Sequence, residues 1–234
     1  MKDITILVVD DDEEIAELVE IYLTNDGYHV IKAYDGQECL KTLEENKQIK
    51  LIILDIMMPN IDGLEVCRKI RKTSNIPIIM LSAKAADMDK IIGFGTGADD
   101  YMTKPFNPLE LMARVKSQLK RYTNLNVGME GSQNDDALEI QDLVINRKAH
   151  KVHKNGTEIN LTPIEFEILY LLASNTGRVF GTDEIFERVW NEKVYEVNNT
   201  VMVHIRRLRE KIEDNPRSPQ ILKTVWGVGY KVED

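Results

Sequence analysis

Carboxylates follow two apolar runs in the first half of the chain. Asp10 and Asp11 come after residues 4–9, and Asp55 ends the run that begins at residue 51. Runs that are apolar on both faces predict buried parallel strands, whose carboxyl ends meet at one edge of a sheet. Clustered acids raise one another's pKa, and Mg²⁺ relieves that conflict. The pattern predicts a nucleophile, Asp55, beside Mg²⁺, although Asp55 alone also fits a turn or helix-cap aspartate.

Two more polar residues end later strands of the same pattern. Ser82 follows the predicted strand 77–81, and Lys104 follows a short predicted strand at 100–102. An ammonium offers a point charge to a phosphoryl oxygen, and a hydroxyl offers a hydrogen bond. Together with Asp55, these groups indicate phosphoryl transfer.

The elements that must position these residues alternate between strand and helix. Five βα units occur in about 120 residues, which predicts an α/β fold with a doubly wound parallel five-stranded sheet. The glycines at 93–97 spell a dinucleotide-binding string, but they follow a predicted helix rather than a strand, so we interpret them as a helix end and turn. We therefore expect a first domain over residues 1–122.

The second half of the chain has a different pattern. Residues 123–136 lose apolar periodicity and are rich in Asn, Gly, Ser and Asp, which predicts a linker. Residues 137–234 begin with short strands, continue through three helices and end in a tight hairpin, which predicts an α+β domain. The net charge is −9, yet from Leu138 onward 14 basic residues nearly balance 15 acidic ones.

The third helix of this domain, predicted from Thr200 onward, carries the basic residues. Its apolar stripe must face the core; the stripe consists of Val201, Ile205, Leu208 and Ile212. The remaining surface offers arginines and small or amide side chains, which suit base edges and phosphates in a major groove. These candidates are Asn199, Val203, His204, Arg206, Arg207 and Arg209. The alternative interpretation is a solvated basic face.

The ordered acids, Ser82, Tyr101 and Lys104-Pro105-Phe106 resemble the receiver domain of two-component response regulators, over residues 4–121. The resemblance implies that Asp55 accepts a phosphoryl group from a sensor histidine kinase and that Ser82 and Tyr101 switch conformation. It also implies a cis Lys104-Pro105 peptide. The implied Mg²⁺ ligands are Asp11, Asp55 and the carbonyl of Met57, with Asp10 assisting through water.

The second half resembles the winged-helix effector domain of the OmpR/PhoB family. The resemblance implies that Arg207 and Val203 read bases of promoter DNA, that His204, Arg206 and Arg209 touch phosphates, and that residues 190–197 contact RNA polymerase. Asn199 and the wing residue Trp226 stand where relatives often have arginine. In this family the receivers form a homodimer. The corresponding residues are Lys90, Phe94, Asp99, Asp100, Glu110, Leu111, Arg114 and Arg121.

Composition and motifs favour a cytoplasmic protein that is not an enzyme. We expect no membrane span and no signal peptide, because no apolar run approaches the ~20 residues that a span needs. Lys-Thr-Val-Trp-Gly-Val-Gly-Tyr near the C-terminus is similar to the branch of the family that controls glycopeptide-resistance genes.

The resulting hypothesis is a phosphorylation-dependent transcriptional regulator that binds promoter DNA as a dimer. One alternative is a constitutive DNA-binding protein with a vestigial receiver. A second is a Mg²⁺-dependent phosphatase that uses Asp55 covalently. The phosphatase would need an acid two residues after the nucleophile, and Met57 occupies that position.

Overall fold

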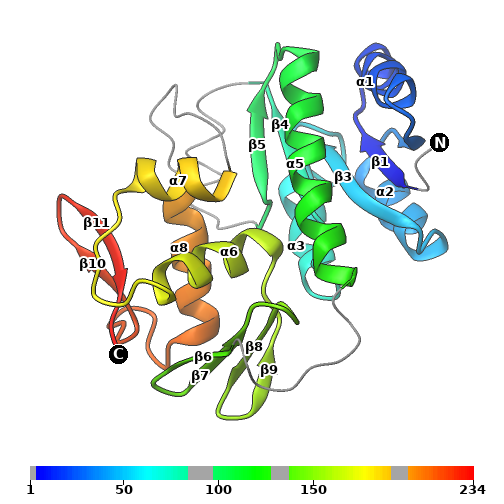
Figure 1. The fold of residues 1–234 in the computed structure, drawn as a ribbon. Helices are drawn as coiled ribbons and strands as arrows, with labels where there is room; N and C mark the ends of the chain where they lie inside the picture. Colours follow the sequence, from blue (N-terminus) through cyan, green and yellow to red (C-terminus); the bar gives the residue numbers. More distant parts are fainter. Residues whose placement is uncertain (1–3, 84–96, 128–136, 191–199) are drawn as a thin grey trace. The chain divides into compact units, whose positions relative to one another are not determined.

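The chain forms two compact units, Met1–Tyr122 and Thr123–Asp234, in a computed structural model (Figure 1). The structure describes residues 4–83, 97–127, 137–190 and 200–234. The receiver-like unit and the C-terminal unit each have their own core, so each is described by itself.

The first unit is built on a five-stranded sheet in the order β2-β1-β3-β4-β5. All neighbouring strands are parallel, which confirms the predicted doubly wound sheet. The strands are β1 (Thr5–Val9), β2 (His29–Ala33), β3 (Ile49–Asp55), β4 (Ile78–Ser82) and β5 (Asp100–Thr103). Strands β1 and β3 are neighbours, as expected at the point where the direction of winding reverses.

Helices cover both faces of this sheet (Figure 1). They are α1 (Glu13–Asn25), α2 (Gly36–Glu45), α3 (Gly63–Arg71) and α5 (Pro108–Val127). Apolar residues of α1 and α5 pack against Ile6, Val8 and Ile53 on one face of the sheet. Apolar residues of α2 and α3 pack against the opposite face. Helix α5 extends to Val127, so its last residues fall within the predicted linker 123–136.

The second unit begins with a four-stranded antiparallel sheet in the order β6-β7-β8-β9. Its strands are β6 (Ala137–Ile140), β7 (Leu143–Asn146), β8 (Lys151–Lys154) and β9 (Thr157–Ile159). Asn155 and Gly156 between β8 and β9 both have positive φ, +49° and +79°, as a two-residue hairpin turn requires.

Three helices and a hairpin complete this unit: α6 (Pro163–Ala173), α7 (Thr182–Trp190), α8 (Thr200–Ile212), β10 (Leu222–Val225) and β11 (Gly229–Val232). Helix α6 begins with a capping box, in which Thr162 and Glu165 cap each other's backbone N–H groups. Helix α8 buries the predicted stripe of Val201, Ile205, Leu208 and Ile212 against α6 and α7. This packing fixes which side of α8 can face a ligand.

Within the described residues, every helix is too short or too polar to cross a lipid bilayer.

Candidate phosphoacceptor and DNA-binding sites

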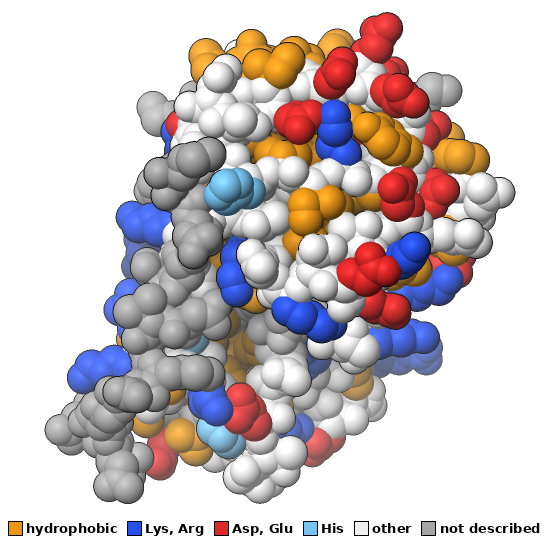
Figure 2. Space-filling view, turned by 90° about the vertical axis from the view of Figure 1, so that its right-hand side faces the viewer, with side chains coloured by type: hydrophobic (Ala, Val, Ile, Leu, Met, Phe, Trp, Pro, Cys, Tyr) orange, Lys and Arg blue, Asp and Glu red, His pale blue; other side chains and the backbone are white. Residues whose placement is uncertain are grey.

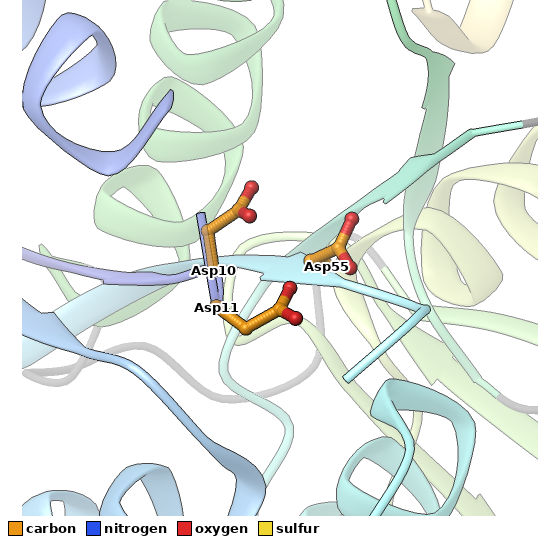
Figure 3. Close-up of side chains that lie close together, drawn as sticks. All are labelled: Asp10, Asp11 and Asp55. Carbon is orange, nitrogen blue, oxygen red and sulfur yellow. The ribbon is translucent and has the colours of Figure 1, made fainter. Parts of the chain in front are cut away.

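The three acids predicted at the sheet edge lie together. Val9 of β1 pairs with Leu54 of β3, so the residues that follow, Asp10 and Asp55, are neighbours. Each of Asp10, Asp11 and Asp55 offers an oxygen atom within 4.8 Å of the others (Figure 3). Asp10 and Asp55 are buried, whereas Asp11 is exposed. The cluster therefore has one side open to solvent.

Lys104 supplies the cation that balances the two buried acids. Its Nζ lies 2.6 Å from Oδ1 of Asp55 and 2.7 Å from Oδ2 of Asp10. Lys104 directly follows β5, and its backbone N–H donates to the carbonyl of Ser82 at the end of β4. The Lys104-Pro105 peptide is cis, as the resemblance implied. Elements far apart in the sequence thus converge on one charged cluster.

Burial and charge act in opposite directions on this cluster. Burial raises the pKa of Asp10, and its hydrogen bond with Lys104 only partly offsets that effect, while the charge of Asp55 raises the pKa further. Burial alone would lower the pKa of Lys104, but its hydrogen bonds with Asp10 and Asp55 outweigh burial, so its pKa is raised. Lys104 therefore stays charged between the two acids.

The backbone of Met57 and Gly63 lies in close contact with Asp55. Oδ2 of Asp55 accepts a hydrogen bond of 2.8 Å from the backbone N–H of Met57. Gly63, the first residue of α3, lies directly against the same strand end. A Cβ at this position would be 2.0 Å from the carbonyl oxygen of Asp55, so only glycine fits here without displacing the backbone. The glycine lets the start of α3 approach the acidic cluster.

Ser82 and Tyr101 lie on neighbouring strands beside the cluster. Ser82 of β4 pairs in register with Thr103 of β5, the residue before Lys104. Ser82 is 1% exposed, and Tyr101, at 7%, packs with the core on the α2 and α3 face. The tyrosine ring thus occupies an inward position.

The donor set suits a hard divalent cation. Carboxylate oxygens are the ligands that Mg²⁺ takes in proteins, and the exposed Asp11 gives the ion a solvated approach. Mg²⁺ would also offset the mutual repulsion of acids that share a single lysine.

The predicted dimer-face residues fall into different environments. Lys90 and Phe94 lie outside the described residues. Asp99 is fully buried and pairs with Arg71 at 2.6 Å, and Leu111 is 2% exposed in the core beneath α5. The structure therefore places these two residues inside the domain, because an arginine and a core cluster already hold them.

The other predicted dimer-face residues form a charged group on β5 and α5. Arg114 donates to both carboxylate oxygens of Asp100, at 2.9 and 3.0 Å, and to Glu110 at 2.8 Å. Arg121, about two helical turns further along α5, is partly buried. These ion pairs lie within one chain.

Helix α8 exposes a narrower face than the sequence predicted. Arg206 is exposed, but Val203 and His204 are 2% and 1% exposed. The His204 ring lies 5.5 Å from that of Trp190 on α7, which explains its burial. Val203 is buried although it is not a member of the effector core. Both side chains are buried, and Asn199 lies outside the described residues.

Arg209 was predicted to touch phosphate, but it points at the C-terminal hairpin instead. Its guanidinium donates to the carbonyl of Leu222 at 2.8 and 2.9 Å and to Oγ1 of Thr224 at 2.8 Å. The guanidinium carbon also lies 5.9 Å from the centre of the Tyr230 ring. Through these contacts Arg209 connects α8 to β10. At the tip of the hairpin Trp226 is 91% exposed and accessible to a ligand.

Two buried glutamates were missed by sequence reasoning. Glu213, just after α8, accepts hydrogen bonds from the backbone N–H groups of Gln220, Ile221 and Leu222, at 2.8, 3.0 and 2.7 Å. Glu165 caps α6 and also contacts α8 through Lys211 at 2.6 Å. Both glutamates contact residues that lie far from them in the sequence, and helical or strand periodicity does not predict such contacts.

Comparison with known proteins agrees with this geometry. Residues 6–116 match the response regulator receiver domain, and residues 156–232 match the C-terminal domain of transcriptional regulatory proteins. The chain is 48% identical to regulatory protein VanRc of Enterococcus gallinarum over 97% of this chain and 98% of that protein. The same identity and coverage hold for regulatory protein VanR of Enterococcus faecium. A solved mutant of RitR shares the fold, with a TM-score of 0.72 at 24% identity, over 98% of this chain and 99% of that one.

Proposed function

Because the chain belongs to the OmpR/PhoB family of response regulators, we propose that phosphorylation of Asp55 controls its binding to promoter DNA. The observation that carries the proposal is the triad of Asp10, Asp55 and Lys104, in which one ammonium lies within 2.7 Å of both buried carboxylates. A vestigial receiver would not need to retain this costly arrangement of buried charges.

In the proposed reaction, an oxygen of Asp55 attacks the phosphorus of a phosphohistidine on a sensor kinase. The phosphorus–oxygen bond forms as the phosphorus–nitrogen bond breaks, and the histidine leaves with its electron pair. Lys104 is already within hydrogen-bonding distance of Asp55, so its ammonium can pair with an oxygen of the incoming phosphoryl group. Ser82 would donate a hydrogen bond to the same group, and Tyr101 would respond to the movement of Ser82.

We place Mg²⁺ among Asp10, Asp11, Asp55 and the carbonyl of Met57. When bound, the ion supplies positive charge that neutralises the phosphoryl oxygens. Asp11 is the accessible carboxylate of the set, which favours it as a direct ligand. Asp10 is already paired with Lys104, which favours an indirect role through water.

The sensor kinase must reach this site from the solvent. Helix α1 begins three residues after Asp10 and exposes Leu18, Ile21 and Tyr22, which are 42%, 55% and 37% exposed. Acidic and hydrophobic side chains alternate on the side of the molecule that carries α1 (Figure 2). We propose this surface as the docking site for the kinase, because it offers exposed apolar side chains on a helix that starts beside the acidic cluster.

On the DNA side, we assign Arg207 to bases in the major groove and Arg206 to phosphate. Asn199, which precedes α8 in the sequence, and Trp226 of the wing are further candidate contacts. Phosphorylation would favour a receiver homodimer through the surface of Asp100, Glu110 and Arg114, with Lys90, Phe94 and Arg121. Two tethered effector domains then bind adjacent half-sites with a raised effective concentration. The regulator would act in the cytoplasm, contact RNA polymerase through residues 190–197 and control glycopeptide-resistance genes.

The experiment is intact mass measurement of the full chain after incubation with Mg²⁺ and acetyl phosphate. We expect one phosphoryl adduct of about 80 Da that Asp55→Asn lacks and that needs Mg²⁺. Size-exclusion chromatography of the same samples should show a dimer only for the phosphorylated chain. An adduct that persists in Asp55→Asn would overturn the assignment of Asp55, and a chain without any adduct would support the vestigial receiver.

A further inference from the structure

Glu165 is an ionisable residue enclosed in the effector domain. It is the third residue of α6 and is 0% exposed. Oε2 of Glu165 accepts a hydrogen bond of 2.8 Å from the backbone N–H of Thr162, which completes the capping box. A glutamine fulfils this capping role equally well, because only an acceptor is needed. The cap therefore does not explain why a buried charge is present.

The charge of Glu165 faces α8. Lys211 of α8 donates to Oε2 of Glu165 at 2.6 Å and to the carbonyl of Asn160 at 2.8 Å. Arg207 lies one turn earlier on α8, and its Nη1 is 4.0 Å from Oε1 of Glu165. Residues four apart lie on the same side of a helix, so both cations face the same carboxylate.

The two oxygens of Glu165 are used differently. Oε2 is shared by the cap and Lys211, whereas Oε1 is buried and accepts no hydrogen bond from any residue that the structure describes. An acceptor left in this state is costly unless a cation is near. The guanidinium of Arg207, whose side chain is 13% exposed, is the cation that lies near Oε1. The carboxylate thus attracts one end of the guanidinium without binding it in a hydrogen bond.

This arrangement limits the directions that Arg207 can take. A free arginine on a helix loses side-chain entropy when it binds a base, and a side chain that is already held loses less. The attraction to Glu165 draws the guanidinium toward α6 and so restricts the directions from which it can approach DNA. Arg206 differs in its surroundings. Its side chain is 58% exposed, and its partner at 3.2 Å, Glu210, belongs to the same helix and is itself exposed.

We propose that Glu165 is a positioning residue for DNA recognition, which aims Arg207 at the base edges through their ion pair. The inference rests on the proposed role of Arg207 in reading DNA. It adds a determinant of sequence specificity from outside the recognition helix, on the first turn of α6.

The test is a double-mutant cycle on the full chain, with Glu165→Gln, Arg207→Ala and the double variant. The DNA is a duplex enriched from a random pool by the phosphorylated native chain, and the reference is a shuffled duplex of equal length. The quantity measured is the ratio of the two affinities. Glutamine keeps the cap and removes the charge, so Glu165→Gln should lower this ratio about tenfold, the scale of one base contact. In the Arg207→Ala background, Glu165→Gln should cause no further loss.

Thr162→Ala is the matched control, because it damages the same cap without changing the charge. It should lower the thermal midpoint and leave the affinity ratio unchanged. If Glu165→Gln fails to fold, Glu165→Asp replaces it, since the shorter side chain keeps the charge but draws it away from Arg207 and should also lower the ratio.

The outcomes separate the inference from the proposed function. Equal, non-additive losses in the two single variants support the inference. A loss in Arg207→Ala alone, or losses that add in the double variant, would overturn it and leave the base-reading role of Arg207 intact. An unchanged ratio in Arg207→Ala would overturn that role and the inference together.

Discussion

The ammonium nitrogen of Lys104 lies 2.6 Å from Asp55, and the same nitrogen lies 2.7 Å from Asp10. A single cation thus holds two buried carboxylates that come from the ends of β1 and β3, while Lys104 itself follows β5. The electrostatic balance of the candidate phosphoacceptor site depends on three separate strands. A substitution at the end of any one of these strands should therefore change the electrostatic energy of the charged residues on the other two.

Replacing Lys104 by methionine should destabilise the receiver domain and make its stability depend more strongly on Mg²⁺. The substitution leaves two carboxylates facing each other, and the loss of one partner from a buried ion pair costs roughly 3 kcal/mol. Mg²⁺ that binds the folded acids recovers part of this loss by mass action. The measurement is denaturant unfolding with and without Mg²⁺.

The control for this prediction is Lys116→Met, which removes the exposed ion pair with Asp26. Surface pairs contribute about 0–1 kcal/mol, so this variant should unfold like the native chain. If Lys104→Met unfolded with the native midpoint at every Mg²⁺ concentration, the electrostatic role of Lys104 would be wrong.

Arg206 and Arg209 should have separable effects on DNA binding. Arg206 is exposed on α8, so Arg206→Ala should weaken binding and reduce the salt slope of the affinity by about 1. Arg209 is occupied by Leu222 and Thr224, so Arg209→Ala should keep the slope but lower the stability of the effector domain by roughly 2 kcal/mol. Affinity over a salt series and denaturant unfolding measure both. An equal fall in salt slope for the two variants would show that Arg209 leaves the hairpin to bind phosphate.

Glu213 should fix the start of the C-terminal hairpin. It accepts hydrogen bonds from three successive backbone N–H groups, at Gln220, Ile221 and Leu222. Glu213→Ala leaves these donors without their charged acceptor, so we expect a loss of about 3 kcal/mol. Hydrogen exchange at the three amides should accelerate as well. Glu210→Ala, which removes an exposed partner of Arg206, is the control and should change stability by less than about 0.5 kcal/mol.

The C-terminal hairpin should also lose stability in acid, because Glu233 becomes protonated. Hydrogen bonds from Lys223 and then Lys231 lower the pKa of Glu233 from its ordinary 4.5 to about 2. A depressed pKa in the folded state means that the contribution to stability is complete above the unfolded value and is lost as pH falls through the folded value. The loss should therefore occur between about pH 4.5 and pH 2. An NMR titration of the Glu233 carboxyl checks this, and Lys223→Met should shift its midpoint upward. A midpoint near 4.5 in the native chain would contradict the paired geometry.

The sheet and its acidic edge were predictable because the signals are local. Residues 51–54 can be apolar on both sides only in a covered strand, and the acid that follows marks the strand end. The same holds for the cap at Thr162 and the turn at Asn155, each of which is encoded within a few residues. The winding of the sheet, in which β1 lies next to β3, then places Asp10 beside Asp55.

The face of α8 was less predictable because periodicity gives the direction of a side chain but not its neighbours. The stripe of Val201 and Ile205 was correct, since it reflects burial of one side. His204 and Arg209 were predicted at the DNA surface, but Trp190 covers the first and the carbonyl of Leu222 binds the second. Both partners come from other elements, so helical spacing could not reveal them. Asp99, held by Arg71, is the same case in the receiver.

An affinity comparison measures whether Asp55 couples phosphorylation to DNA binding. The full chain and Asp55→Asn are each titrated onto the enriched duplex, before and after treatment with Mg²⁺ and acetyl phosphate. Treatment should tighten binding of the native chain at least about tenfold, through the raised effective concentration of a dimer, and leave Asp55→Asn unchanged. A native chain that takes up the phosphoryl group and binds the duplex with the same affinity as before would contradict the account.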